Sequence, residues 1–320
     1  MEAGRERVEV TSASAVLRAV AQNLARVVHA PPETLRMCVL CLVSEGHLII
    51  EDFPGVGKTM LAKALSRSLD CSFSRLQFTP DLLPSDVTGV NVFNQKSNQF
   101  EFRPGPVFTN LLLVDEINRA SPKTQAALLE SMQENQVTID GVTHELGRPF
   151  MVMATQNPIE YEGTYPLPEA QLDRFTMRIS IGYPPLSEEA KMLTEQTSEP
   201  PLDALEPVTG TQELLAVVDE ARRVFVEESL NRYVVALLRH TRSDPRLYLG
   251  ASPRSGIALL RVAKARALLD ERDYAVPDDV KAVAEAVIAH RLILAPEARA
   301  AGLSGGDLVR DAVEKTPVPV

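Results

Sequence analysis

The stretch EDFPGVGKTM, residues 51–60, matches the phosphate-loop pattern G-x-x-x-x-G-K-[ST] at every fixed position except the first. Counting back five positions from Gly57 reaches Asp52, where the pattern requires glycine. A carboxylate that faced a chain of phosphates would repel it. The stretch therefore predicts a phosphate site, and it raises the question of where the Asp52 side chain points.

The segments on either side of this loop have the order that a phosphate loop requires. HLII (47–50) predicts a buried strand, and KTMLAKALSRSLD (58–70) predicts a helix. Backbone N–H groups of such a loop surround a phosphate, and the dipole of the following helix favours the negative charge. Lys58 then binds the β- and γ-phosphates, and the Thr59 hydroxyl is a ligand for Mg²⁺. The other predicted nucleotide-binding residues of the loop are Pro54, Gly55, Val56, Gly57 and Met60.

Polar groups end two further apolar runs. LLLVDE (111–116) ends in Asp115 and Glu116, and carboxylates at the end of a buried strand are unfavourable unless they bind something. Asp115 fits a Mg²⁺ partner, usually through water, and Glu116 fits the base that polarises the attacking water. Asn157, which ends the run in PFMVMATQNP, reaches the γ-phosphate or its water if the two strands are neighbours. Taken alone, Asn-Pro also marks an ordinary turn.

Two arginines complete the set of candidate residues. Arg174 lies in LPEAQLDRF, between a short helical pattern and a strand pattern. Arg254 lies in GASPRSG, at the start of a later helical pattern. Taken alone, an arginine is more often a surface ion pair than a functional group.

Strand and helix patterns alternate through the first half of the chain. This alternation predicts an α/β fold in which an αβα core has a parallel sheet with helices on both faces. After SEPPLDALEPVTG (198–210), which is rich in proline and acid, only helical patterns remain, and we expect a small all-α domain with a partly frayed tail from about residue 300. The expected divisions are a core at 1–182 with hairpins near 90–105 and 136–146, a linker at 183–210 and a helical domain at 211–320.

Composition and charge exclude several classes of protein. Of the 320 residues, 45% are apolar and 24% are charged, which is typical of soluble globular proteins. The net charge of −10 argues against a dedicated nucleic-acid binder, whose affinity comes mainly from Lys and Arg. We expect no signal peptide in the charged N-terminus and no membrane span, and the three cysteines suit a cytoplasmic protein. Cys38 and Cys41 are interpreted as buried helix residues, and the five histidines show no metal-ligand spacing.

Four stretches together resemble the MoxR family of AAA+ ATPases: PGVGKT, LLLVDEINRASPKTQAALLESMQE, MVMATQNPIEYEGTYPLPEAQLDRF and GASPRSG. The resemblance runs from about residue 10 to about 295 and implies an AAA+ P-loop NTPase core followed by a helical lid. It assigns Lys58 and Thr59 to Walker A, Asp115 and Glu116 to Walker B, Asn157 to sensor 1, Arg174 to the arginine finger that serves a neighbouring subunit, and Arg254 to sensor 2.

The resemblance also implies cofactors and partners. Members of the family use ATP and Mg²⁺, assemble as rings that are usually hexameric, and act as chaperone-like remodellers. They often work with a von Willebrand factor A domain protein to mature protein complexes. One departure is that His29 and Ala30 replace a glycine-bearing turn expected near the adenine, so selectivity for the base is left open. Either Gly or Asp occurs in the family at the position of Asp52, and Asp suits turn geometry and can bond to local backbone.

The two predicted hairpins bear on the alternatives. They resemble insertions of the helix-2-insert branch of AAA+ proteins, in which the first hairpin interrupts a helix. The first hairpin here has Lys96 and Arg103, whereas the second has no Lys or Arg, which favours contact with protein over contact with DNA. A DNA translocase or helicase-like motor, the motor subunit of a metal chelatase and a non-catalytic nucleotide-binding scaffold remain as alternatives to the remodeller.

Overall fold

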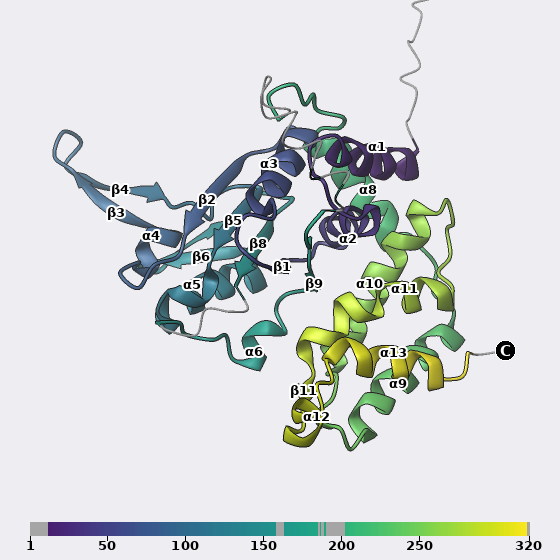
Figure 1. The fold of residues 1–320 in the computed structure, drawn as a ribbon. Coiled ribbons are helices and arrows are strands. Elements are labelled where there is room, and N and C mark those ends of the chain that lie inside the picture. The colour runs from purple at the N-terminus through teal and green to yellow at the C-terminus, as the bar shows by residue number, and fades with distance from the viewer. Residues whose placement is uncertain (1–11, 158–162, 185, 187–188, 190–201, 319–320) are drawn as a thin grey trace, which may run out of the picture.

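The computed structural model describes residues 12–157, 163–184, 186, 189 and 202–318. A parallel sheet with the strand order β2-β5-β8-β1-β9 lies at the centre of the first part (Figure 1). This sheet confirms the predicted fold class. Its strands are β1 (Leu48–Glu51), β2 (Phe73–Gln77), β5 (Leu111–Asp115), β8 (Met151–Gln156) and β9 (Met177–Ile179).

Side chains of the sheet alternate between two apolar layers. Leu48 and Ile50 of β1 belong to a cluster that includes α1 (Ala13–Ala25), α2 (Pro32–Val43) and α3 (Lys58–Ser68). Ile49, between them, belongs to a second cluster on the other face. That cluster includes apolar side chains of α5 (Pro122–Glu134). Successive strand residues point to opposite faces, so continuous apolar runs such as that of β1 are what a sheet covered on both sides requires.

The predicted N-terminus of α5 is confirmed. Ser121 precedes the helix, and its hydroxyl accepts the backbone N–H of Thr124 at 3.4 Å, as an N-cap residue does. Asn135 ends the helix with a positive φ of 51° and leads directly into a hairpin of β6 (Gln136–Ile139) and β7 (Val142–Glu145). Asp140 and Gly141 form the predicted turn, with φ values of 50° and 81°.

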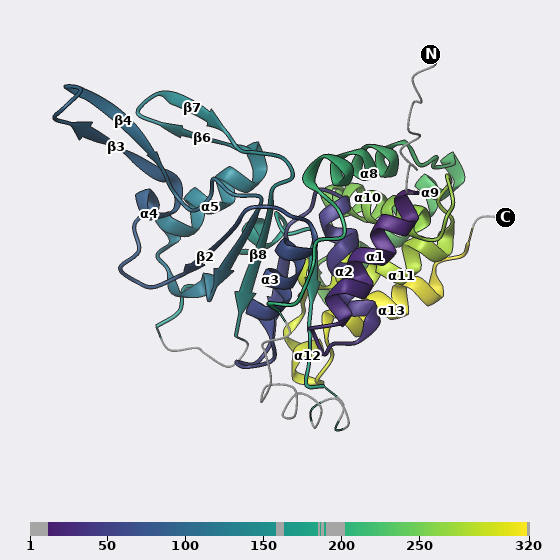
Figure 2. The same cartoon turned by 90° about the horizontal axis from the view of Figure 1, so that it is seen from above.

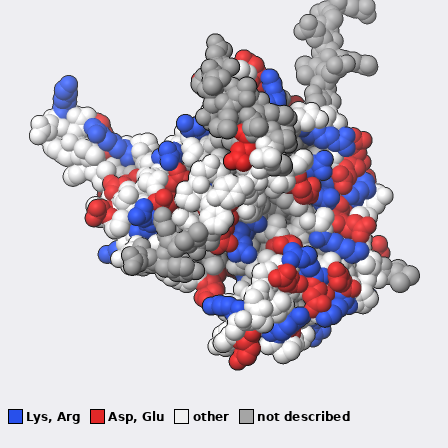
Figure 3. Space-filling model, viewed as in Figure 1, with Lys and Arg blue, Asp and Glu red and all other residues white. Residues whose placement is uncertain are grey.

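A second hairpin, of β3 (Gly89–Asn94) and β4 (Gln99–Pro104), extends away from the body on the same side as β6 and β7 (Figure 2). The hairpin was predicted, but its expected position inside a helix was wrong. It follows the short helix α4 (Pro84–Thr88), and the fully described stretch from β4 to β5 contains no further helix. A space-filling view shows basic side chains at the end of this hairpin, and the sequence places Lys96 in its turn (Figure 3).

The second part of the chain is mainly helical, as predicted, with two corrections. A short antiparallel pair, β10 (Leu247–Leu249) and β11 (Ile293–Leu294), was not expected. The tail is not frayed, because α13 (Gly305–Lys315) buries Leu308, Val309 and Ala312. The other helices are α8 (Thr211–Arg223), α9 (Glu228–Ser243), α10 (Pro253–Leu269), α11 (Pro277–Ile288) and α12 (Pro296–Ala300).

The helical part packs against α1 and α2, which lie on one face of the sheet, and its helix α11 also contacts the edge strand β9. A single apolar cluster contains Val16 of α1, Leu40 of α2, Leu113 of β5 and Leu259 of α10. This continuous core fixes the helical part beside the edge strand β9 (Figure 1). Much of the expected linker at 183–210 lies outside the described residues. None of the helices described here is long and apolar enough to cross a membrane.

Candidate functional site

The glycine-bearing loop has the backbone geometry of an anion site. Gly55 and Gly57 have φ values of +86° and +98°, in the left-handed region that favours glycine. A Cβ at either position would meet no atom within 4 Å, so conformation and not space requires glycine there. The helix α3 begins at Lys58, directly after Gly57, and its first backbone N–H groups have no partner within the helix. The loop and the start of α3 therefore favour a bound phosphate.

An open cavity of about 370 Å³ lies over this loop. It brings together the predicted loop residues with Asp115 and Glu116 at the end of β5 and Asn157 at the end of β8. Val56 is the exception among the loop residues, because it packs against the apolar core. The lining residues are Pro54, Gly55, Gly57, Lys58, Thr59, Met60, Arg75, Gln77, Asp115, Glu116, Thr155 and Asn157.

Asp115 is buried and held in place by two neighbouring strands. Arg75 on β2 donates from Nε to Asp115 Oδ2 at 2.7 Å. Thr155 on β8 donates from its hydroxyl to Asp115 Oδ1 at 3.3 Å. The same hydroxyl accepts the backbone N–H of Glu116 at 2.9 Å. Thr155 therefore orients both acids of the predicted Walker B pair.

Glu116 has an uncommon backbone conformation. Its φ of 56° and ψ of 53° place it in the left-handed region, which is strained for a residue with a side chain and is often found at functional sites. Gln77 Nε2 donates to Glu116 Oε2 at 2.8 Å, and Arg119 Nη1 donates to the same oxygen at 2.9 Å. These two donors keep the carboxylate at the wall of the cavity.

The Asp52 carboxylate points toward the end of β9 and is buried. Its Oδ2 accepts hydrogen bonds from Ile181 N at 2.6 Å, Gly182 N at 2.8 Å and the Ser180 hydroxyl at 3.1 Å. Its Oδ1 accepts the backbone N–H of Phe53 at 3.1 Å, which is the local bond that the sequence predicted. The backbone carbonyl oxygen of Asp52 accepts a hydrogen bond from the Lys58 ammonium at 2.7 Å. Asp52 is thus a structural anchor, and its negative charge is directed at backbone donors.

Three residues that line the cavity, Arg75, Gln77 and Thr155, were not predicted from the sequence. Arg75 and Gln77 lie two positions apart on β2, so they project to the same side of the strand. That R-x-Q spacing was a usable signal, because the strand ends at the same edge as the acids of β5. Thr155 gave a weaker signal, since a threonine in an apolar strand is ordinary.

The two predicted arginines lie elsewhere. Arg174 follows α6 (Glu169–Leu172), and Arg254 is in the first turn of α10. Among the described residues, neither of them lines the cavity over the loop. Their neighbours Asp173 and Ser252 are in contact, with the Ser252 hydroxyl 3.4 Å from both oxygens of Asp173.

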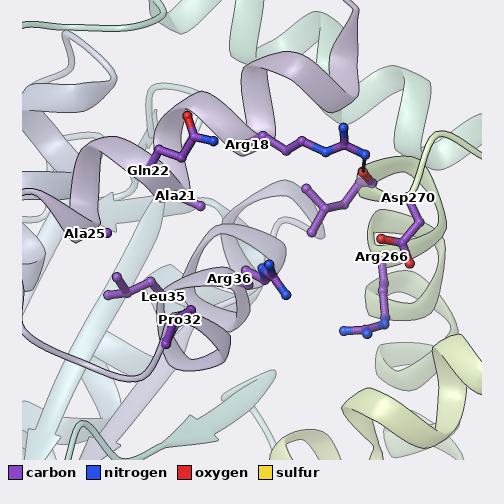
Figure 4. A pocket seen from close by; sticks show the side chains of 10 residues that line it. Arg18, Ala21, Gln22, Ala25, Pro32, Leu35, Arg36, Arg266 and Asp270 are labelled. Atoms are coloured by element: carbon purple, nitrogen blue, oxygen red, sulfur yellow. Dashed lines mark hydrogen bonds between the residues drawn. The ribbon is translucent and has the colours of Figure 1, made fainter. Parts of the chain in front are cut away.

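A separate cavity of about 400 Å³ lies between α1, α2 and α10 (Figure 4). Its three arginines are compensated by acids: Arg18 pairs with Glu271 at 2.8 Å, and Arg36 and Arg266 pair with Glu33 at 3.3 and 2.9 Å. The positive charge that lines this cavity is therefore already balanced by acidic side chains of the same chain.

Cys38 and Cys41 are buried in α2, as predicted, and burial raises the pKa of the Cys38 thiol to about 12. Burial also raises the pKa of the Cys41 thiol well above its ordinary value, so both thiols are protonated and unreactive at neutral pH. In the part of the chain that the structure describes, no group of three or more His, Cys, Asp or Glu side chains could hold a metal ion.

The parallel sheet, the glycine loop before α3 and the polar ends of β5 and β8 define a P-loop NTPase fold with a helical lid. Residues 47–177 match the family described as "ATPase family associated with various cellular activities (AAA)", and residues 239–312 match the AAA lid domain. The chain belongs to the MoxR family of AAA+ ATPases.

Several relatives support this assignment. The chain is 39% identical to Chaperone MoxR1 of Mycobacterium tuberculosis, covering 92% of this chain and 80% of that protein. It is 48% identical to YeaC, an uncharacterized protein of Bacillus subtilis, over 93% of both chains. The crystal structure of a candidate ATPase from Cytophaga hutchinsonii superposes with a TM-score of 0.89 at 38% identity, covering 96% of each chain.

Proposed function

We propose that this protein binds ATP with Mg²⁺ in the cavity over the glycine loop and hydrolyses it to ADP and phosphate. The observation that carries the proposal is that one cavity collects Lys58, Thr59, Asp115, Glu116 and Asn157 from three separate parts of the chain. Phosphate-binding backbone, a lysine, a hydroxyl and two carboxylates are the groups that phosphoryl transfer to water requires.

The residues present fit the nucleotide and its metal ion. Thr59 and Asp115 offer the hard oxygen ligands that Mg²⁺ prefers, with Asp115 acting through water. When bound, Mg²⁺ neutralises charge on the β- and γ-phosphates. Lys58, whose ammonium donates to the Asp52 carbonyl at 2.7 Å, is close enough to the loop to turn to a phosphate.

Hydrolysis assigns separate tasks to the residues at the end of the sheet. Glu116 polarises the attacking water, and Thr155 keeps its backbone in position through the 2.9 Å hydrogen bond. Asn157 orients that water or the γ-phosphate from the neighbouring strand. Gln77 and Arg119 hold the Glu116 carboxylate until the water is in place.

Arg174 and Arg254 act from outside the cavity of an isolated chain. We propose that Arg174 is the arginine finger and reaches ATP bound by a neighbouring subunit, which couples turnover to assembly as a ring, in the family usually a hexamer. Arg174 does not line the cavity over the glycine loop of its own chain among the described residues, and this supports action on a neighbouring subunit. Arg254, in the first turn of α10, reaches the γ-phosphate from the lid when the lid closes.

We further propose that ATP turnover drives the remodelling of a protein client in the cytoplasm, together with a von Willebrand factor A domain partner. A chaperone role is supported by the name of a relative, Chaperone MoxR1 of Mycobacterium tuberculosis. The projecting β3–β4 hairpin exposes 47% of Phe93 and 72% of Phe100, which suits contact with polypeptide more than with a phosphate backbone. These features favour the remodeller over the DNA motor.

The proposal is tested by nucleotide binding and steady-state turnover with Mg²⁺. The wild type is expected to hydrolyse ATP and to stop when Mg²⁺ is chelated, and Lys58→Ala is expected to lose both binding and turnover. Turnover by Lys58→Ala at the wild-type rate would contradict the assignment of the cavity. Stimulation by DNA that disappears steeply with added salt would favour the motor instead.

A further inference from the structure

The segment that carries Arg174 is held by the helical part on both sides of that residue. Arg291, at the end of the 3-10 turn η2 (Ala289–Arg291), forms an ion pair with Asp173, with Nε 3.1 Å from Oδ1. Nη2 of the same arginine donates to the backbone carbonyl of Phe175 at 2.7 Å. Arg291 therefore binds the residue before Arg174 and the residue after it.

This attachment is buried. The Arg291 side chain is 4% exposed, and that of Asp173 is 22% exposed. His290 lies beside it, with Nε2 3.1 Å from the Phe175 carbonyl. A carbonyl can only accept, so Nε2 carries the proton, and burial lowers the pKa of His290 well below its ordinary value and keeps the ring neutral. The Phe175 carbonyl thus receives two hydrogen bonds from the helical part.

The same carboxylate contacts the helix that bears the second arginine. Ser252, the N-cap residue of α10, lies 3.4 Å from both oxygens of Asp173, and its hydroxyl accepts the backbone N–H of Ser255 at 3.2 Å. Arg254 is two residues further along in the first turn of this helix. Asp173 is therefore a junction between the segment of Arg174 and the start of the helix of Arg254.

The charges at the junction agree with the geometry. Burial lowers the pKa of Arg291 to about 10, Asp173 raises it, and Arg254 lowers it. Arg291 remains protonated at neutral pH and needs the Asp173 carboxylate, because an unpaired buried charge is strongly unfavourable. A cavity of about 600 Å³ borders Asp173, Ser252 and Arg291, so the segment has room to shift when the helical part moves.

We propose that Arg291 is a positioning residue for Arg174. It acts through Asp173 and Phe175, and the Asp173 junction transmits movement of the Arg254 helix to Arg174. This inference rests on the proposed function, in which Arg254 contacts the ATP of its own subunit and Arg174 the ATP of the next. A change in the lid of one subunit then alters the arginine that it presents to its neighbour.

The first test compares Arg291→Met with Arg272→Met. Arg272 is a matched control, because it pairs with buried Asp279 at 2.6 and 2.7 Å, and its ion-pair partners among the described residues, Asp279 and Asp270, both lie in the helical part. Arg291→Met is expected to lower kcat by about 10- to 100-fold, since small misplacements of a catalytic group have effects of this size. Its Kd for ATP is expected to change less than about threefold, because Arg291 is not among the described residues that line the cavity over the glycine loop. Arg272→Met is expected to keep the wild-type kcat.

The second test uses mixed rings, with co-assembly verified by differently tagged subunits. An Arg291→Met subunit keeps its own nucleotide site, so Lys58→Ala subunits, which keep their Arg174 segment, should restore turnover. Mixing Arg291→Met with Arg174→Ala should restore nothing, because both lack a working finger. If Arg291 served only folding, the Arg291→Met subunit would behave in the same way with either partner, so recovery with Lys58→Ala alone would not be seen.

The outcomes separate the inference from the proposed function. If Arg174→Ala recovers with Lys58→Ala but Arg291→Met does not, the inference is overturned and the finger stands. If Arg174→Ala itself does not recover, both are overturned. Should Arg291→Met fail to fold, Asp173→Asn provides the same test, because it weakens the ion pair with little change in volume. Wild-type kcat in Asp173→Asn would also overturn the inference.

Discussion

The Asp52 carboxylate accepts the backbone N–H of Ile181 at 2.6 Å, and so joins the first turn of the phosphate loop to the end of β9. Gly182, the next residue, donates to the same oxygen at 2.8 Å. The residue that departs from the loop pattern therefore satisfies backbone donors where the chain leaves the sheet for the helical part. Its charge is directed at these backbone donors, which removes the apparent conflict with a phosphate site at the loop.

Replacing Asp52 should affect stability more than nucleotide binding. Asp52→Gly leaves the N–H groups of Ile181 and Gly182 without their acceptor, and a buried donor that loses its charged partner destabilises by about 2–4 kcal/mol. We expect this loss in urea unfolding, with a Kd for ATP close to that of the wild type. Glu51→Gln is the control, because Glu51 pairs with Arg178 at 2.8 Å in a partly exposed position and should change stability by less than about 1 kcal/mol. A large gain in ATP affinity in Asp52→Gly would show that the carboxylate opposes the phosphates.

Thr155 should matter for the rate of hydrolysis and little for binding. Thr155→Val removes the hydroxyl that contacts both Asp115 and the backbone of Glu116 but keeps the shape of the side chain. We expect kcat to fall by about tenfold or more, because the water-polarising carboxylate loses its fixed position. Thr155→Ser keeps the hydroxyl and should retain most of the activity. Equal rates in the Val and Ser variants would contradict the orienting role.

Stability should decline below neutral pH because of buried His47. Its Nδ1 accepts the backbone N–H of Val152 at 3.0 Å, and burial lowers its pKa to about 4 from 6.5. The unfolded chain therefore binds the proton first as the pH falls, so the contribution to stability is full above about pH 6.5 and is lost toward pH 4. Between pH 7 and pH 5 the loss from this residue is about 2 kcal/mol.

The variant His47→Gln separates this effect from other titrations. The free energy of unfolding in urea should change between pH 7 and pH 5 by about 2 kcal/mol less in His47→Gln than in the wild type. An identical pH dependence in the two proteins would mean that His47 does not control this decline.

The sequence was sufficient to predict the central sheet and the loop, for clear physical reasons. Runs such as LLLV in β5 are apolar throughout because the strand is covered on both faces, and the acids that follow must lie at the carboxyl edge of a parallel sheet. Lys58, Asp115 and Asn157 could therefore be assigned to one cavity before their distances were known. Ser121 and Pro122 likewise identify the start of α5 from local chemistry alone.

The features that were missed depend on contacts between distant segments. Ile181, the hydrogen-bond partner of Asp52, lies 129 residues after it in the sequence, and no local pattern indicates that pairing. β10 and β11 are too short, at three and two residues, to show an alternation. The segment of α13 was expected only as part of a partly frayed tail, although Ser304 and Asp307 form a capping box at its start and the apolar face of the helix is buried.

The proposed function requires Glu116 to activate water for ATP hydrolysis in the cavity over the glycine loop. Its most direct test is Glu116→Gln, which preserves the size of the side chain and removes the base. We expect a Kd for ATP within about threefold of the wild type and a turnover reduced by at least about 100-fold, in the range of a lost general base. Turnover of ATP by Glu116→Gln at the wild-type rate would contradict the role of Glu116 as the base.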